Sequence, residues 1–289
     1  MLFRQRRETA LKELESPGSG VPVPLGYVEP HARMLKTPPD SQLLYKMMTV
    51  ENLLRSIEGG YLYFNRVDHY RDFPGADPND GAQLPQDRKG NEAARFAKAH
   101  DYSAADYYDT SRSRTYACCF SIENSDYIWI EYANGSEKGK VCVVFHFGSL
   151  RSMLNQTLGN AALSYNGNQC RQVFSIDYGI VDYVDWDIHQ ANAARLPNPV
   201  SYTYLKGSAF SAEKELRICL ATLGMGRFAL NDGSIMVFPP SLQIGFDFRT
   251  ALANGTICQI LRSPGCDAAF LKAELDKFGI APAPGSDPP

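Results

Sequence analysis

Residues 43–67 constrain the fold more than any other stretch of the sequence. LLYKMM (43–48) has the composition of a short strand, and YLYFNRV (61–67) has that of a second one. The segment between them, TVENLLRSIEGG, predicts an amphipathic helix with Thr49 as its N-cap and Gly59-Gly60 as its stop, because its apolar residues recur at helical spacing: Val50, Leu53, Leu54 and Ile57. The folded part therefore opens with strand, helix and strand within about 25 residues.

The remaining strands and helices alternate irregularly. Strand patterns recur in TYACCFS (115–121), KVCVVFHF (140–147), QVFSIDYGIVDYVDW, MVFPPSLQIGFDF and TICQIL, with helical patterns in DYIWIEYAN, GSLRSMLNQTLGNAAL and AAFLKAELDKFG. A doubly wound parallel sheet would show regular strand–helix alternation. The pattern favours an α+β fold instead.

The domain boundaries follow from composition. Proline is concentrated at both ends, so we expect an irregular N-terminal arm over residues 1–41 and a disordered tail over 281–289. Residues 42–280 then form one α+β domain. Within it, residues 68–114 are polar and rich in Gly, Pro, Asp and Tyr, and a span this long is typical of an insertion or an active-site cover.

Charge, cysteines and hydropathy narrow the class of protein. A formal net charge of −3 gives no global electrostatic reason for tight binding to nucleic acid or to an anionic membrane. The 7 cysteines show no CxxC spacing and several lie in apolar runs, which is typical of reduced core thiols in a cytoplasmic protein. No apolar run reaches the roughly 18 residues that a membrane span needs. The five histidines show no metal-ligand spacing, so we expect no metal site.

SAEKELRIC (211–219) carries three charges in what otherwise resembles an apolar strand. On a strand, Glu213, Glu215, Arg217 and Cys219 share one face, and that charged face cannot belong to the core. The two carboxylates would be roughly 7 Å apart, which suits a catalytic pair acting on one ligand. The alternative is a solvent-exposed face on which Arg217 screens Glu215. Spacing alone leaves both open.

Several landmarks occur together and in order: LLYKMM, EGGYLYFNRV, CCFSIENSDYIWIEYANG with GKVCVVF, and AEKELRIC. Over roughly residues 43–265 this order resembles the bacterial family named domain of unknown function 2971. The most specific parts are Trp129 with Tyr132 and the group Glu213, Glu215 and Arg217. Two departures stand out: the family's F-N-D-P stretch is replaced by DHYRDFPGADPNDG, which contains Asn79 and Asp80, and its aromatic residue after the second Glu is Leu216.

The same layout is similar to the mono-ADP-ribosyltransferase fold, a split, mostly antiparallel sheet flanked by helices that clasps NAD. By position, the resemblance places Lys46 at the basic residue of the first strand, Phe120-Ser121 at the middle motif and Glu215 at the catalytic acid, with Glu213 before it. A Lys at position 46 departs from the His or Arg of that fold. The implied partners are NAD as substrate and a protein or nucleic-acid acceptor, and the implied role is that of a toxin or phage-defence effector.

The residue types suit this chemistry. Breaking the nicotinamide–ribose bond builds positive charge on the anomeric carbon, which a carboxylate such as Glu215 stabilises most in the transition state. Glu213 would orient or deprotonate the acceptor. Cofactor contacts are expected from Lys46, Ser121 and Arg217, and from the rings of Tyr45, Tyr63 and Tyr132.

Two other functions remain open on the sequence alone. A hydrolase or nuclease would use the same acidic strand with a Tyr, Lys or His. A non-catalytic module would bind a nucleotide or nucleic acid in the same cleft.

Overall fold

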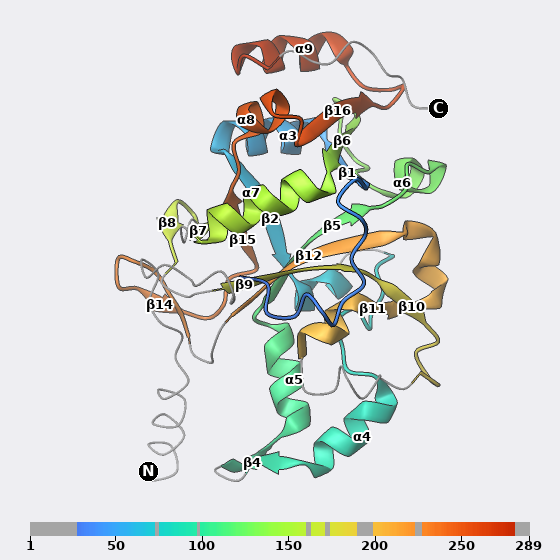
Figure 1. Cartoon of the computed structure of the whole chain (residues 1–289), viewed down its shortest axis with the longest axis vertical. Helices are drawn as coiled ribbons and strands as arrows, with labels where there is room; N and C mark the ends of the chain where they lie inside the picture. Colours follow the sequence, from blue (N-terminus) through green and yellow to red (C-terminus); the bar gives the residue numbers. More distant parts are fainter. Residues whose placement is uncertain are drawn as a thin grey trace.

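The structure is a computed structural model, shown in Figure 1. The first 27 residues of the expected arm and the whole expected tail lie outside the part that it describes. The described residues are 28–72, 75–96, 99–159, 163–170, 174–189, 199–222 and 227–280.

The predicted opening unit is confirmed. Strand β1 (Leu43–Thr49), helix α3 (Val50–Gly59) and strand β2 (Tyr61–Arg66) follow one another directly. Thr49 caps the helix by accepting the backbone N–H of Asn52, and Gly60 ends it in the left-handed region at φ 62°. The cap and the stop therefore lie where the sequence predicts them, since local side-chain chemistry decides both.

A large antiparallel sheet forms the centre of the molecule (Figure 1). Each strand pair described within it is antiparallel. One path through the sheet runs β16-β6-β1-β5-β2-β15-β7-β8, and β12 and β9 extend it from β5. The strands not yet bounded are β5 (Thr115–Ser121), β6 (Lys140–His146), β7 (Leu163–Tyr165), β8 (Asn168–Gln169), β9 (Phe174–Ile180), β12 (Glu215–Thr222), β15 (Ser241–Gly245) and β16 (Ile257–Arg262).

The sheet divides at β5. One edge of β5 pairs with β12 over its full length. Its other edge is shared: β1 meets it at Ser121, and β2 meets it at Tyr116 and Ala117. Strands β1 and β2 therefore diverge from β5, and the β5 residues between these contacts, 118–120, face the gap. We call this gap the split.

Helices and short elements surround the sheet. Helices α3 and α7 (Phe147–Gly159) pack against its strands, whereas α4 (Pro85–Ala93) and α5 (Ala104–Arg112) lie together at the opposite end of the molecule from α9 (Figure 1). The other elements are α6 (Asp126–Glu131), α8 (Phe248–Ala253), α9 (Ala268–Lys277), η1 (Val67–Asp72), η2 (Pro199–Tyr204), η3 (Ser208–Glu213), β3 (Arg95–Phe96), β4 (Ala99–Ser103), β10 (Asp182–Val184), β11 (Leu205–Gly207), β13 (Phe228–Ala229) and β14 (Ile235–Met236).

Both faces of β12 are buried. Leu216, Ile218 and Leu220 enter the main core with Phe64 and Phe145. The opposite face, which carries Glu215 and Arg217, lies under the polar insertion and η2, and Arg217 is 1% exposed. The expectation that a charged face cannot belong to the core is therefore wrong, because the charges are paired with one another.

The chain just before residue 42 also packs on this sheet. Val28 is buried in the main core, and Glu29 accepts hydrogen bonds from Arg151 on α7. The backbone N–H of Ile180 donates to the carbonyl of Lys36. Residues 28–41 are thus irregular in backbone but attached to the domain.

Candidate active site

The acidic strand begins two residues later than its sequence suggests. Glu213 ends the 3-10 helix η3, Lys214 takes a left-handed conformation at φ 47°, and β12 starts at Glu215. The predicted placement of Glu213 on the strand is therefore wrong. The backbone reversal at Lys214 still brings the two carboxylates together, because both contact the ammonium of Lys206. The N–H of Glu215 donates to the hydroxyl of Tyr183, with 2.8 Å between the N and O atoms.

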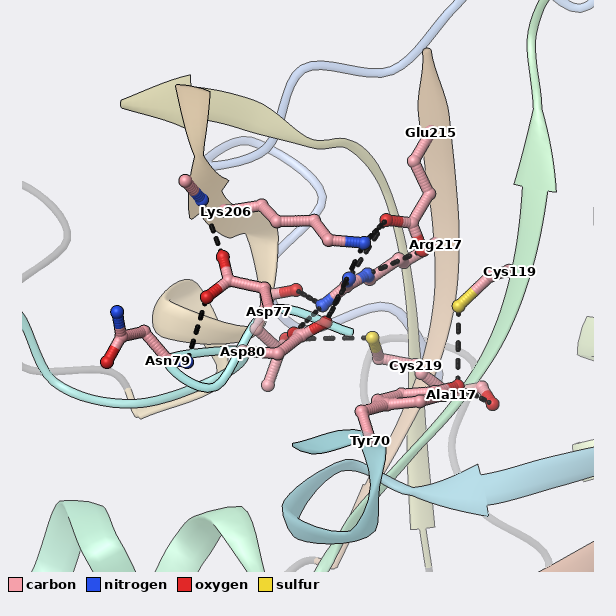
Figure 2. Close-up of polar contacts among 12 residues, drawn as sticks. Tyr70, Asp77, Asn79, Asp80, Ala117, Cys119, Lys206, Glu215, Arg217 and Cys219 are labelled. Carbon is pink, nitrogen blue, oxygen red and sulfur yellow. Dashed lines mark hydrogen bonds and ion pairs between the residues drawn. The ribbon is translucent and has the colours of Figure 1, made fainter. Parts of the chain in front are cut away.

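Five buried charged residues form what we call the charge cluster. They come from four segments of the chain, and Figure 2 shows the Arg217 guanidinium between the carboxylates of Glu215 and Asp80. Three carboxylates share two cations in direct ion-pair contact. The members are Asp80, Lys206, Glu213, Glu215 and Arg217.

Arg217 uses all five of its N–H groups. Its Nε donates to Oε1 of Glu215 at 2.8 Å, and its Nη2 donates to Oε2 of Glu215 at 2.9 Å. Toward the insertion, Nη1 and Nη2 donate to the two oxygens of Asp80, the latter at 2.8 Å. Nη1 also donates to the carbonyl of Thr203 at 2.8 Å, and the ring of Tyr70 lies 5.6 Å from the guanidinium carbon. This geometry fixes the guanidinium between two carboxylates.

Lys206 joins the two glutamates. Its Nζ lies 2.5 Å from Oε2 of Glu213 and 3.5 Å from Oε2 of Glu215. The ring of Phe210 lies 5.1 Å from the same ammonium. On the other side of Glu213, the Tyr132 side chain forms a hydrogen bond with the carboxylate.

The environment separates the acidities of the two glutamates. Burial alone would raise the pKa of Glu215, but the charges of Arg217 and Lys206 hold it down to about 2. Burial and the neighbouring Glu215 charge raise the pKa of Glu213, and Lys206 and Tyr132 offset only part of that rise. The surroundings thus favour the ionised form of Glu215 more strongly than that of Glu213, a division that active sites use for different catalytic roles.

The polar insertion supplies one member of the charge cluster. Asp80 is 3% exposed and faces Arg217, while Asp77 is 2% exposed and accepts the backbone N–H groups of Gly207 and Asn79. The stretch FPGADPNDG therefore carries one buried carboxylate that ties down the loop and one that holds the arginine. Asp80 and Lys206 were not among the predicted site residues. The signal for Asp80 lay in its position within the stretch that replaces F-N-D-P.

Three predicted site residues form a row across adjacent strands. Tyr45 on β1 is the register partner of Ser121 on β5, and Ser121 is the register partner of Glu215 on β12. Their side chains therefore share one face of the sheet where β1 leaves β5. Ser121 is buried, and its hydroxyl donates to the carbonyl of Glu123 at 2.8 Å.

Lys46 lies in the split. Its Nζ donates to the Cys119 carbonyl at 3.2 Å, and it lies 5.1 Å from the centre of the Phe120 ring. Burial lowers the pKa of Lys46, but Cys118, Cys119 and the charge of Glu215 together raise it above its usual value. Lys46 therefore donates to a carbonyl in the part of β5 that faces the split. It also lies close enough to Glu215 for the two charges to interact.

The two other predicted tyrosines occupy different positions. Tyr132 follows α6 and reaches Glu213, so the structure brings it to the charge cluster. Tyr63 lies on β2 opposite Gln243 of β15 and is 42% exposed. As a nicotinamide or adenine contact, each stays a prediction.

Two cavities among the described residues lie away from the charge cluster. One of about 680 Å³ is lined by residues of α3, α7 and α8, including Ile57, Phe248 and Arg249. A second of about 430 Å³ lies beside Glu29 and Arg151. Neither is lined by a residue of the charge cluster. Every member of the cluster is buried, so the cluster is in a closed arrangement.

Comparison with protein-family models gives no match, and comparison with curated proteins gives none either. Among solved structures, DarT of Thermus sp. 2.9 in complex with ADP-ribosylated ssDNA is similar over 87% of this chain and 95% of that chain, at 13% identity and a TM-score of 0.31. An overlap this loose carries no argument about function. No helix among the described residues has the length and apolar character needed to cross a membrane.

Proposed function

We propose that this protein is an ADP-ribosyltransferase-like enzyme that cleaves the nicotinamide–ribose bond of NAD and transfers ADP-ribose to a protein or nucleic-acid acceptor. The observation that carries the proposal is the state of Glu215. It is a buried carboxylate held ionised, with a pKa of about 2, in one row with Ser121 and Tyr45 beside the split of an antiparallel sheet.

The chemistry assigns a separate role to each carboxylate. When the bond between the ribose C1′ and the nicotinamide nitrogen breaks, its electron pair leaves with nicotinamide and C1′ becomes cationic. The negative charge of Glu215 stabilises that cation in a site where water is excluded. A nucleophilic O or N of the acceptor then bonds to C1′, and its proton passes to Glu213. The raised pKa of Glu213 makes it the stronger base of the two.

The closed arrangement adds a condition to this proposal. Glu215 is 5% exposed, and Tyr132 and Lys206 both contact its neighbour Glu213. NAD therefore reaches Glu215 only when covering side chains move aside. We assign this movement to Tyr132, which is partly exposed and follows the short helix α6.

The test is NAD turnover by the purified protein. We expect release of nicotinamide, and transfer of labelled ADP-ribose to an acceptor in a lysate, with both falling at least 100-fold in Glu215→Gln because the neutral amide cannot stabilise the cation. Glu58→Gln, an exposed residue on α3, is the matched control and should retain full turnover. Circular dichroism and thermal unfolding check that Glu215→Gln is folded.

Absence of both NAD binding and turnover at millimolar NAD would refute the proposal. The charge cluster is buried and lines neither of the two cavities, which argues against catalysis at Glu215. The second candidate is therefore a non-catalytic nucleotide-binding module. Saturable NAD binding without nicotinamide release, unchanged by Glu215→Gln, would support that candidate instead.

A further inference from the structure

We infer that Asp80 is a positioning residue, which holds Glu215 in its reactive orientation through Arg217. This inference rests on the proposed function. It assigns a role to a carboxylate from the polar insertion that is far in sequence from the acidic strand. The evidence is the arrangement of the two carboxylates about one guanidinium (Figure 2).

The geometry leaves the guanidinium one orientation. Glu215 takes the Nε and Nη2 edge of Arg217, and Asp80 takes the Nη1 and Nη2 edge. The Thr203 carbonyl takes the remaining N–H. Because each edge is held by two parallel hydrogen bonds, neither carboxylate can rotate without breaking its pair. Asp80 thus restricts the arginine, and the arginine restricts Glu215.

Arg217 and Glu215 need this external support because they are two residues apart on one strand. Their side chains emerge from the same face of β12, and the strand backbone alone does not fix the side-chain torsion angles of either residue. Asp80 reaches them from a different segment, with its carboxylate 4% exposed. A contact that spans 137 residues of sequence makes the orientation of Glu215 depend on the insertion.

Asp77 provides a matched control from the same loop. It is also buried, but its oxygens accept the backbone N–H groups of Gly207 and Asn79. Asp77→Asn therefore weakens two contacts to backbone N–H groups and leaves the groups that face Arg217 in place, whereas Asp80→Asn removes the charge and one acceptor that face Arg217. A purely structural role predicts that both substitutions lower activity in proportion to the stability they cost.

The first experiment measures NAD turnover. In Asp80→Asn we expect kcat to fall at least tenfold with the KM for NAD changed by less than threefold, because the lost orientation matters in the transition state. Asp77→Asn should retain kcat within threefold, even if its melting temperature falls by as much as that of Asp80→Asn. If Asp80→Asn does not fold, Asp80→Glu keeps the charge but displaces it by one methylene, and the same separation of kcat from KM is expected.

The second experiment is independent of NAD. In ¹⁵N NMR spectra of the arginine side chains, the Arg217 Nε–H and Nη–H signals should be resolved and protected from solvent exchange. Asp80→Asn should average the Nη–H signals and speed their exchange, while Asp77→Asn leaves them in place. Unchanged Arg217 signals in Asp80→Asn would overturn the inference.

The outcomes separate the two proposals. Normal turnover in the native protein, with equal kcat losses in Asp80→Asn and Asp77→Asn, overturns the positioning role alone. A native protein that does not turn over NAD overturns the proposed function, and the catalytic role of Asp80 with it. In that case, averaged Arg217 signals in Asp80→Asn would show that Asp80 fixes the guanidinium of Arg217 but that this contact has only a structural role.

Discussion

Arg217 shows how a residue can be identified correctly from sequence and yet be assigned an incomplete environment. Its spacing from Glu215 predicted that the two would share a face, and the structure confirms that they do. The sequence interpretation placed that face toward solvent or a ligand. In the described structure every donor of the guanidinium is instead taken by protein atoms, so its predicted contact with a cofactor stays a prediction that requires a rearrangement.

Replacing Arg217 with Met should destabilise the protein strongly and in a pH-dependent way. It leaves Asp80 and Glu215 buried without their main cation, which typically costs about 3–5 kcal/mol at neutral pH. The loss should be smaller at pH 4.5 than at pH 7.5, because carboxylates deprived of the arginine can take up protons. Urea unfolding at the two pH values measures this difference.

Arg55→Met on the exposed side of α3 is the control and should change the unfolding free energy by less than about 0.5 kcal/mol at either pH. A loss in Arg217→Met that is equal at both pH values would contradict the electrostatic explanation.

At the scale of elements, the junction between η3 and β12 decides where Glu213 points. The period-2 pattern of EKELRIC suggested a continuous strand, but Lys214 adopts a left-handed backbone conformation at φ 47°. That single reversal ends the 3-10 helix, starts the strand and turns Glu213 toward Lys206. A lysine has no intrinsic preference for this conformation, so surrounding contacts impose it.

Substitutions of Lys214 should therefore depend on backbone freedom more than on charge. Lys214→Gly relieves the left-handed strain and should leave the unfolding free energy unchanged or raised by up to about 1 kcal/mol. Lys214→Val, whose β-branched side chain resists this conformation, should lower it by about 1–2 kcal/mol and reduce NAD turnover by displacing Glu213. Urea unfolding and nicotinamide release check both, and equal stability of the two variants would argue against a strained junction.

At the scale of the whole molecule, two buried carboxylates on different strands make opposite contributions to stability. The pKa of Glu215 is lowered to about 2, so its stabilisation is complete above its unfolded pKa and is lost as the pH falls toward 2. On β9, burial raises the pKa of Asp177 to about 7 despite the nearby backbone N–H of His31. Asp177 binds a proton more tightly in the folded state, so stability is lost as the pH rises from about 4 to 7.

Asp177→Asn should remove the loss of stability that occurs as the pH rises from about 4 to 7. A shift from 3.8 to about 7 corresponds to about 4 kcal/mol at most, so the variant should be more stable than the native protein at pH 8 and similar to it at pH 4. Denaturant unfolding across this pH range tests the prediction. Asp276→Asn, on the exposed side of α9, should show no such pH-dependent gain, and a native stability that is level from pH 4 to pH 8 would contradict the assignment.

The opening strands and helix, and the burial of several cysteines, show which features can be predicted from local sequence. The opening strand, helix and strand were predicted with their cap and stop. Cys118, Cys142 and Cys219 are buried thiols, as the apolar runs around them indicated. Both results depend on neighbours within a few residues, where periodicity and capping act.

The site was predictable in part. The row of Tyr45, Ser121 and Glu215 brings together three residues predicted for one site, although the sequence does not state the register that aligns them. Asp80 and Lys206 were missed because their partners lie 137 and 7 residues away, on segments whose pairing no local pattern encodes.

The sequence by itself determined the α+β class, the central strands and the side chains available for chemistry, since short-range periodicity and residue type encode these. Tertiary structure alone decided that three carboxylates and two cations meet in the interior and that the insertion supplies one of them. The physical reason is that a buried charge is tolerated only when its partner is brought to it, and that partner here comes from a distant part of the chain.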